Sequence, residues 1–258
     1  MTGLLFTDNC TTLTERSFSV ALGALGITEG DAVMVHSDLA RFGKLSCAGD
    51  VAVSSLTGVL KGAVGSGGSI LMPTFNYDFC NGIPFDPKTT RPMTGAWGRR
   101  LLSEQDVYRS SHPIYSMAVW DPTARGFANK WDDSFGRGSP FERLHQQRGK
   151  LIFWGVGIES CTFIHYVEQC YTVPYRFMKA FNVGRQWCTM YARDLTKGLS
   201  TSLVELGRRL VLSGEMSMVR VGTGTISAVS ADAMWCEAIA MLDADIYSLT
   251  KPERTDRE

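Results

Sequence analysis

Several features that would assign this 258-residue chain to a membrane or to a secretory pathway are missing. No run of about 18 consecutive apolar residues occurs, so the sequence predicts no membrane-spanning segment. The N-terminal residues 1–5 lack a basic region followed by an apolar core, and we expect no signal peptide. The seven cysteines form no C-x-x-C pair and have no regular spacing, which favours reduced thiols over a disulfide framework. We therefore expect a cytoplasmic protein.

An excess of charge of either sign is also missing. The chain has 26 Lys and Arg residues and 26 Asp and Glu residues, which argues against a nucleic-acid partner or an acidic substrate. The G-x-S-x-G elbow, the Walker A loop and the G-x-G-x-x-G fingerprint are absent, which argues against an α/β-hydrolase, a P-loop enzyme or a dinucleotide oxidoreductase.

The patterns that are present predict one α/β domain over residues 1–258: a layered open sheet with βαβ units flanked by helices. Residues 76–95 are predicted to form an irregular insertion, and the chain from about 177 to 258 shows the least regular pattern. Ser139 is predicted to cap a short turn that begins with Pro140, and Asp50 to cap the second helix. The other predicted strands span residues 32–35, 69–72, 115–120, 151–154, 216–221 and 225–229, and the other predicted helices span 12–26, 96–104, 201–212 and 230–242.

The junction after residues 151–154 is the strongest candidate for a site. This apolar run is typical of a strand buried on both faces, and it ends at Gly155 and Gly157. His165 and Glu168 follow, three residues apart, so a helix would place both side chains on one face. Open α/β sheets bind ligands at the carboxyl ends of their strands. His165 is therefore our candidate for a general base.

The other histidines have competing interpretations. His36 follows a strand, and a packed, hydrogen-bonded role is as good an interpretation as a ligand contact. The same holds for His112, which precedes Pro113 in a turn. His145 lies in a polar stretch and is interpreted as exposed and structural.

The residues of the same junction are compatible with two further kinds of chemistry. Cys161 lies four residues before His165, so the two could form a nucleophilic pair, although a small buried residue is the favoured interpretation of Cys161. His165 and Glu168 could supply two metal ligands, but no third candidate has suitable spacing, and we predict no metal site.

Eight short motifs occur in a fixed order over roughly residues 14–176. They are V-H-S-D-L (35–39), V-G-S-G-G-S-I-L-M-P-T-F (64–75), F-D-P (85–87), R-S-S-H-P (109–113), S-P (139–140), G-V-G (155–157), T-F-I-H-Y-V-E (162–168) and P-Y (174–175). Together they resemble the aminoglycoside 3-N-acetyltransferase family, also called the antibiotic N-acetyltransferase family. The C-terminal third is similar only loosely.

The resemblance implies an α/β enzyme, distinct from the GNAT acetyltransferases, that moves an acyl group from acetyl-CoA to an amine without a metal. Direct transfer in a ternary complex is expected, with His165 taking the proton of the amine. Glu168 would orient or charge-balance the imidazole, or help to hold the amine. The Thr162 hydroxyl or backbone N–H groups would stabilise the oxyanion. The residues expected to contact the coenzyme are His36, Ser37, Leu39, Thr74, Phe75, Ser110, His112 and Ser116.

The acceptor is less well defined by the resemblance. Cys161 stands where the family usually has Asn, which removes an amide contact. Aminoglycosides are polycations and favour an acidic cleft, which the balanced charge of the chain does not suggest. A mono-amino compound such as an amino sugar, a nucleotide-linked amino sugar or a natural-product amine fits equally well, so the expected acceptor is an amine of an aminoglycoside-like, amino-sugar or natural-product compound. The alternative function is a non-catalytic CoA-binding or assembly component. We expect no nucleic-acid or membrane partner, and a homodimer is left open.

Overall fold

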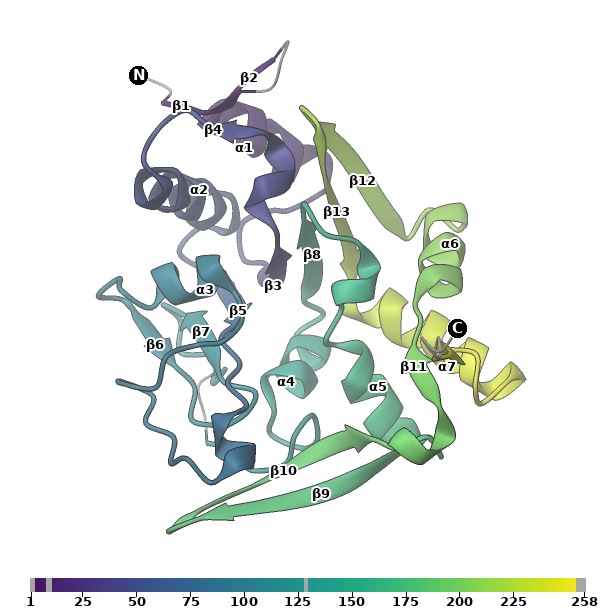
Figure 1. Ribbon diagram of the computed structural model, residues 1–258. Helices are drawn as coiled ribbons and strands as arrows, with labels where there is room; N and C mark the ends of the chain where they lie inside the picture. Colours follow the sequence, from purple (N-terminus) through teal and green to yellow (C-terminus); the bar gives the residue numbers. More distant parts are fainter. Residues whose placement is uncertain (1–2, 8–10, 128–129, 254–258) are drawn as a thin grey trace, which may run out of the picture.

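A computed structural model describes residues 3–7, 11–127 and 130–253, and their centre is a seven-stranded mixed sheet (Figure 1). The strand order is β12-β13-β8-β3-β5-β7-β6. These strands span Ala32–Ser37 (β3), Ser69–Pro73 (β5), Val107–Arg109 (β6), Met117–Trp120 (β7), Lys150–Trp154 (β8), Met216–Val221 (β12) and Gly224–Ser230 (β13). Strands β3, β5 and β8 run parallel, whereas the other pairs are antiparallel. The carboxyl ends of β3, β5 and β8 therefore meet at one edge of the sheet.

Helices cover both faces of this sheet. Successive residues of the central strands point to opposite faces, and both faces carry apolar side chains that need to be buried. Met34, Leu151 and Phe153 contribute to one hydrophobic core, whereas Val33 and Ile152 contribute to the other. The first core lies under α4 (Pro140–Gln146), α5 (Ile164–Tyr171), α6 (Val204–Leu212) and α7 (Ala231–Ala244). The second lies under α1 (Glu15–Ala24), α2 (Gly49–Val64) and α3 (Ala96–Leu101). The layered α/β architecture predicted from the sequence is confirmed.

Most predicted elements are present. The run 151–154 is fully buried, as expected for a central strand. β3, α2 and β5 form the predicted βαβ unit. The Ser139 side chain accepts a hydrogen bond from the backbone N–H of Glu142 at 3.1 Å and caps α4. The hairpin of β12 and β13 and the final helix are also confirmed.

Three predicted helix starts are wrong. In the segment 201–212, α6 starts only at Val204, because Thr201 belongs to a short strand, β11 (Leu199–Thr201). The segment 12–26 begins as a short strand, β2 (Thr12–Thr14), and α1 starts only at Glu15, because Thr12–Thr14 pairs with β1 (Leu4–Thr7). Asp50 does not cap α2: the helix begins one residue earlier, at Gly49, so Asp50 lies in its first turn. A negative charge there favours the helix through the dipole rather than through a cap.

The C-terminal third contains elements that the sequence patterns did not reveal. β9 (Arg176–Val183) and β10 (Gln186–Arg193) form a long antiparallel hairpin, which runs below α4 and α5 in Figure 1. The remaining strands are β4 (Lys44–Leu45), which pairs with β1, and the pair of β11 (Leu199–Thr201) and β14 (Thr250–Pro252). Short 3-10 turns span Leu39–Phe42 (η1), Asp78–Asn81 (η2), Ile158–Ser160 (η3) and Leu195–Lys197 (η4).

The insertion 76–95 is irregular apart from η2, as predicted. A search of the described residues finds no helix that combines the length and apolar character needed to cross a membrane.

Candidate active site

His165 and Glu168 lie on one face of α5, which follows the carboxyl end of β8 after a loop that contains η3. His165 Nδ1 is 2.6 Å from Glu168 Oε2. The carboxylate is fully buried, whereas 24% of the histidine side chain is exposed. The i, i+3 spacing seen in the sequence therefore produces a direct contact, and part of the imidazole stays exposed.

Arg176, the first residue of β9, is the third member of this cluster. Its Nε lies 2.7 Å from the same Glu168 oxygen, and only 9% of its side chain is exposed. The guanidinium also donates to Thr201 Oγ1 at 2.9 Å. A buried carboxylate needs such partners, because an unpaired charge away from water is costly.

Burial and the charges in the cluster together favour the neutral form of His165. Burial lowers its pKa from the ordinary value of 6.5, Arg176 lowers it further, and Glu168 opposes both. Burial raises the pKa of Glu168, but the charges of His165 and Arg176 and the hydrogen bond to His165 outweigh this and lower it. The carboxylate can then only accept, so Nδ1 of His165 carries the hydrogen. A neutral imidazole in this tautomer has its lone pair on Nε2, where a base needs it.

Aromatic rings connect His165 to the end of β5. The Phe135 ring lies 5.4 Å from the His165 ring, centre to centre, and 4.5 Å from the ring of Tyr115. Tyr115 in turn contacts Phe75 edge to face at 5.3 Å. This wall makes the surroundings of the imidazole largely apolar, which agrees with the lowered pKa of His165.

His36 connects the end of β3 to the segment before α5. Its Nε2 accepts a hydrogen bond from the backbone N–H of Thr162 at 3.2 Å, and Thr162 Oγ1 lies at the same distance. Burial lowers the pKa of His36 to about 4, so the ring is neutral near pH 7. His36 is therefore a structural link that also faces the cavity described next.

Two cavities open at the carboxyl edge of the sheet. The strand-end cavity, about 370 Å³, lies between β3, β5 and the loop after β8, and is lined by His36, Ser37, Phe75 and Thr162 among others. The helix cavity, about 560 Å³, extends from Ser37 and Leu39 to the start of α2. Five of the sequence-predicted residues thus line cavities at one edge of the sheet.

The other four predicted coenzyme residues lie in the interior, and none of them lines either cavity. Thr74 and Ser116 bond to each other's backbone, with Ser116 Oγ donating to the Thr74 carbonyl at 2.8 Å. Ser110 Oγ accepts from the Met117 N–H at 2.7 Å. His112 Nδ1 accepts from the N–H groups of Ile114 and Tyr115, each at 3.1 Å. These contacts hold the turn from β6 to β7 against β5.

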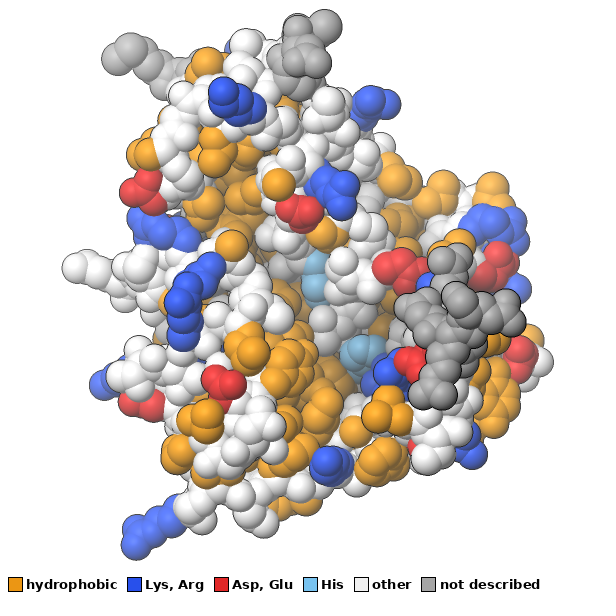
Figure 2. All heavy atoms as spheres, in the orientation of Figure 1, with side chains coloured by type: hydrophobic (Ala, Val, Ile, Leu, Met, Phe, Trp, Pro, Cys, Tyr) orange, Lys and Arg blue, Asp and Glu red, His pale blue; other side chains and the backbone are white. Residues whose placement is uncertain are grey.

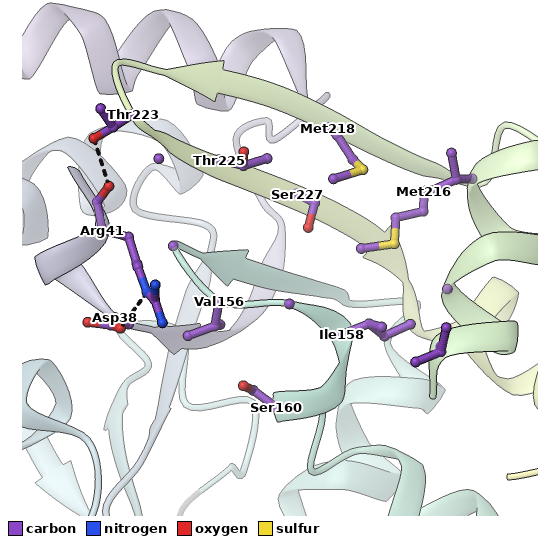
Figure 3. A pocket seen from close by; sticks show the side chains of 16 residues that line it. Asp38, Arg41, Val156, Ile158, Ser160, Met216, Met218, Thr223, Thr225 and Ser227 are labelled. Carbon is purple, nitrogen blue, oxygen red and sulfur yellow. Dashed lines mark hydrogen bonds and ion pairs between the residues drawn. The ribbon is translucent and has the colours of Figure 1, made fainter. Parts of the chain in front are cut away.

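A third cavity, the loop cavity of about 640 Å³, lies between the β12–β13 hairpin and the loop after β8 (Figure 3). Met216 and Met218 face Ile158 across it, and the ion pair between Arg41 and Asp38, 3.1 Å long, closes one end. Val156 and Ser160 line this cavity and the strand-end cavity alike. Figure 2 shows the hollow on this face, with histidine side chains at its centre.

Gly155 is required where β8 meets this edge. Its φ of +76° lies in the left-handed region, and an added Cβ would collide with the Asp38 carbonyl oxygen. No side chain can occupy this position while β3 and β8 stay paired, because the backbone after β3 lies against it. Gly157, in contrast, has nothing within 4 Å of its missing Cβ and opens into the loop cavity.

Cys161 is buried, with 3% of its surface exposed. Burial raises the pKa of its thiol to about 12, against smaller opposing effects from backbone N–H groups, so it is protonated near neutral pH. This is a poor nucleophile. Over residues 3–7, 11–127 and 130–253, no cluster of three or more His, Cys, Asp or Glu side chains has a geometry suited to a metal ion.

Sequence reasoning missed Arg176, Tyr115 and Phe135. Arg176 reaches Glu168 only because the β9–β10 hairpin folds back against α5, and no local spacing encodes that contact. The hairpin itself had a signal: two eight-residue runs separated only by Gly184 and Arg185, a common two-residue turn.

The fold and the site together define a class: an open α/β sheet with a histidine–carboxylate pair at its carboxyl edge, suited to acid–base chemistry on a bound ligand. Residues 34–243 match the family model described as aminoglycoside 3-N-acetyltransferase. This match covers most of the chain, and the protein belongs to that family.

Curated relatives and solved structures agree with this assignment. The chain is 32% identical over 182 residues to aminoglycoside N(3)-acetyltransferase III of Serratia marcescens, covering 62% of this chain and 66% of that protein. It is 28% identical over 196 residues to the prophage-derived aminoglycoside N(3')-acetyltransferase-like protein YokD of Bacillus subtilis, covering 66% and 69%. The matched region thus spans a little under two thirds of the length of the Serratia relative.

Among solved structures, AAC-IIIb in a binary complex with CoASH superposes with a TM-score of 0.73 at 23% identity, covering 90% of this chain and 97% of that one. AAC(3)-IVa in complex with apramycin gives 0.77 at 22% identity, covering 95% and 96%. These likenesses establish the fold, which is that of the aminoglycoside acetyltransferases and not the GNAT fold.

Proposed function

We propose that the protein transfers an acetyl group from acetyl-CoA to the amine of a small molecule, by direct transfer in a ternary complex with His165 as general base. The observation that supports this most is the cluster of His165, Glu168 and Arg176. It favours a neutral imidazole and fixes the hydrogen on Nδ1, so that the lone pair is on Nε2 of a side chain that is 24% exposed. Relatives named aminoglycoside N(3)-acetyltransferase support the reaction class.

We place the coenzyme in the helix cavity and the strand-end cavity, which share Ser37. No side chain caps the N-terminus of α2, which borders the helix cavity at Gly49. Free backbone N–H groups and the helix dipole at such a terminus favour phosphate. A fold neighbour was solved with CoASH, which supports a coenzyme as co-substrate. The thioester would then lie near Thr162, which lines the strand-end cavity.

In the transfer step, the amine attacks the thioester carbonyl, and His165 Nε2 takes a proton from the nitrogen as the C–N bond forms. The positive charge that develops on the imidazole is balanced by Glu168, which accepts from Nδ1. The Thr162 hydroxyl donates to the oxyanion, and the C–S bond then breaks to release the coenzyme thiol. Preorganised donors of this kind supply a large share of catalysis in acyl transfer.

The test is release of free thiol from acetyl-CoA in the presence of amines. His165→Ala should reduce kcat by about two to four powers of ten, the range typical of lost acid–base catalysis. His145→Ala is the matched control, since His145 bonds to Tyr166 and Asp232 and lies outside the cluster. Equal turnover of wild type and His165→Ala would refute the assignment. Coenzyme binding without thiol release, for every amine tried, would favour the non-catalytic alternative.

A further inference from the structure

The outer edge of β9 is open to pairing with another strand. The β9–β10 hairpin is a two-stranded sheet, so each of its strands has one outer edge. Figure 1 shows β9 at the lower rim of the molecule, with β10 between it and the helices α4 and α5. β9 is eight residues long and pairs with β10 without a register shift. Long, regular edge strands of this kind are templates for pairing with another chain.

The hydrogen bonds of β10 show which backbone groups of β9 point outward. The N–H of Thr189 points away from β9, because it donates to the Asp132 carbonyl at 2.8 Å. Ala180 lies directly opposite Thr189 in the register. Residues directly opposite in an antiparallel pair either exchange two hydrogen bonds or both point their backbone groups outward. Ala180 therefore points its N–H and C=O outward, as do Met178 and Asn182, two residues away on either side. We call the backbone groups of these three residues the free edge.

The two outer edges of the hairpin differ in what covers them. The segment 132–134 covers that of β10, where the Ser134 N–H also donates to the Thr189 hydroxyl at 3.1 Å. Within residues 3–7, 11–127 and 130–253, no group forms a hydrogen bond to the free edge, and its three residues are exposed. Edge strands are commonly protected by proline, by a bulge or by charge. β9 contains no proline and no bulge, and Lys179 is the charged residue in its exposed part.

A second copy of this chain fits the free edge, because two antiparallel β9 strands can exchange hydrogen bonds about a two-fold axis. Outward-pointing residues must face each other, so the axis passes through Lys179, Ala180 or Phe181. An axis at Lys179 places two like charges directly opposite, which is destabilising. An axis at Phe181 leaves Met178 beyond the end of the other strand.

An axis at Ala180 avoids both problems. It pairs Ala180 with its own copy and Met178 with Asn182, so the whole free edge is used. Lys179 then lies opposite Phe181 of the second copy. The Lys179 ammonium already lies 5.0 Å from the centre of the Phe181 ring in its own strand, and such cation–π contacts are favourable. The one charge in the exposed part of β9 therefore selects this register.

From this geometry we propose that the protein forms a homodimer in which the β9 strands of two copies pair antiparallel about a two-fold axis at Ala180. The interface is a continuous four-stranded sheet of order β10-β9-β9-β10. It covers part of the apolar surface of Phe177 and Met178, which are 48% and 44% exposed in one copy. The proposal goes beyond acetyl transfer and does not rest on it.

The first experiment is size-exclusion chromatography with light scattering, which should give twice the mass of the chain at micromolar concentration. Ala180→Pro removes an outward N–H, the position where an edge strand tolerates proline, so the hairpin itself keeps its hydrogen bonds. The dissociation constant of the dimer should rise by at least about tenfold, because bonds to the second copy are lost. Trp187→Pro is the matched control: this residue lies opposite Asn182, so its N–H points to the outer edge of β10. A monomeric wild type would overturn the proposal, and so would an Ala180→Pro dimer as tight as the wild type.

Cysteine substitutions test the register independently of the proline variants. Ala180→Cys places two thiols across the axis on residues whose Cα atoms are about 5.5 Å apart, within the range of a disulfide. Asn182→Cys is the matched control, because Asn182 faces Met178 of the second copy and not its own counterpart. With oxidised glutathione, Ala180→Cys should give a covalent dimer on a non-reducing gel, whereas wild type and Asn182→Cys should not. Equal cross-linking of the two variants, or none in Ala180→Cys, would refute the pairing.

Discussion

Replacing Glu168 by Gln should destabilise the protein strongly, because it leaves Arg176 as an unpaired buried cation. The two side chains are 0% and 9% exposed and their closest atoms are 2.7 Å apart. Removing one partner from a buried ion pair typically costs about 3–5 kcal/mol of unfolding free energy. Removing one partner from an exposed ion pair costs only about 0–1 kcal/mol. Arg41→Gln, which breaks the exposed contact to Asp38, therefore serves as the control.

A double-mutant cycle separates the pair from its surroundings. Since each single change leaves an uncompensated group, Glu168→Gln with Arg176→Gln should cost less than the sum of the single changes, by about 2 kcal/mol. Urea unfolding of the four proteins near neutral pH measures this. Additive costs would refute the account of the buried cluster.

The effect of Glu168 should also depend on pH. The pKa of the folded carboxyl lies below its ordinary value of 4.5. Its contribution to stability is therefore present above pH 4.5 and is lost as the pH falls through the folded pKa. The difference in stability between wild type and Glu168→Gln should shrink over that acidic range.

Two further changes test other parts of the structure. Cys161→Ala should keep most of the wild-type activity, because the buried thiol stays protonated. Intact-mass analysis of the wild type during turnover should detect no acyl-enzyme. If the wild type became acetylated and Cys161→Ala did not, transfer through Cys161 would be supported instead. Ser139→Ala removes the cap of α4 and should lower the unfolding free energy by about 1 kcal/mol. Urea unfolding measures this change. An unchanged unfolding midpoint would show that the cap contributes nothing to stability.

The sequence was sufficient for the elements whose pattern is local. The run 151–154 was recognised as a central strand because all its side chains are apolar, and the His165–Glu168 pair because helical spacing alone brings the two side chains together. Family motifs ordered along the chain added the reaction class. These predictions depend on residues that are neighbours in sequence or repeat with a fixed period.

Tertiary contacts account for what the sequence did not reveal. Thr74, Ser110 and Ser116 are polar residues near strand ends, which suggests a ligand, yet each bonds to backbone groups that only the folded sheet brings close. Arg176 joins the site through the β9–β10 hairpin, whose first strand is mostly exposed and shows no alternation of buried and exposed residues. Exposed strands lack the period-2 signal from which strands are recognised.

The role of His165 is tested most directly by the pH dependence of kcat/KM, with acetyl-CoA saturating and a mono-amine as acceptor. The histidine must be neutral to act as base, and its pKa lies below 6.5. The account predicts that kcat/KM falls on the acidic side with an apparent pKa below 6.5, and that His165→Ala lowers the rate and removes this inflection. An acidic limb that persists unchanged in His165→Ala would contradict it.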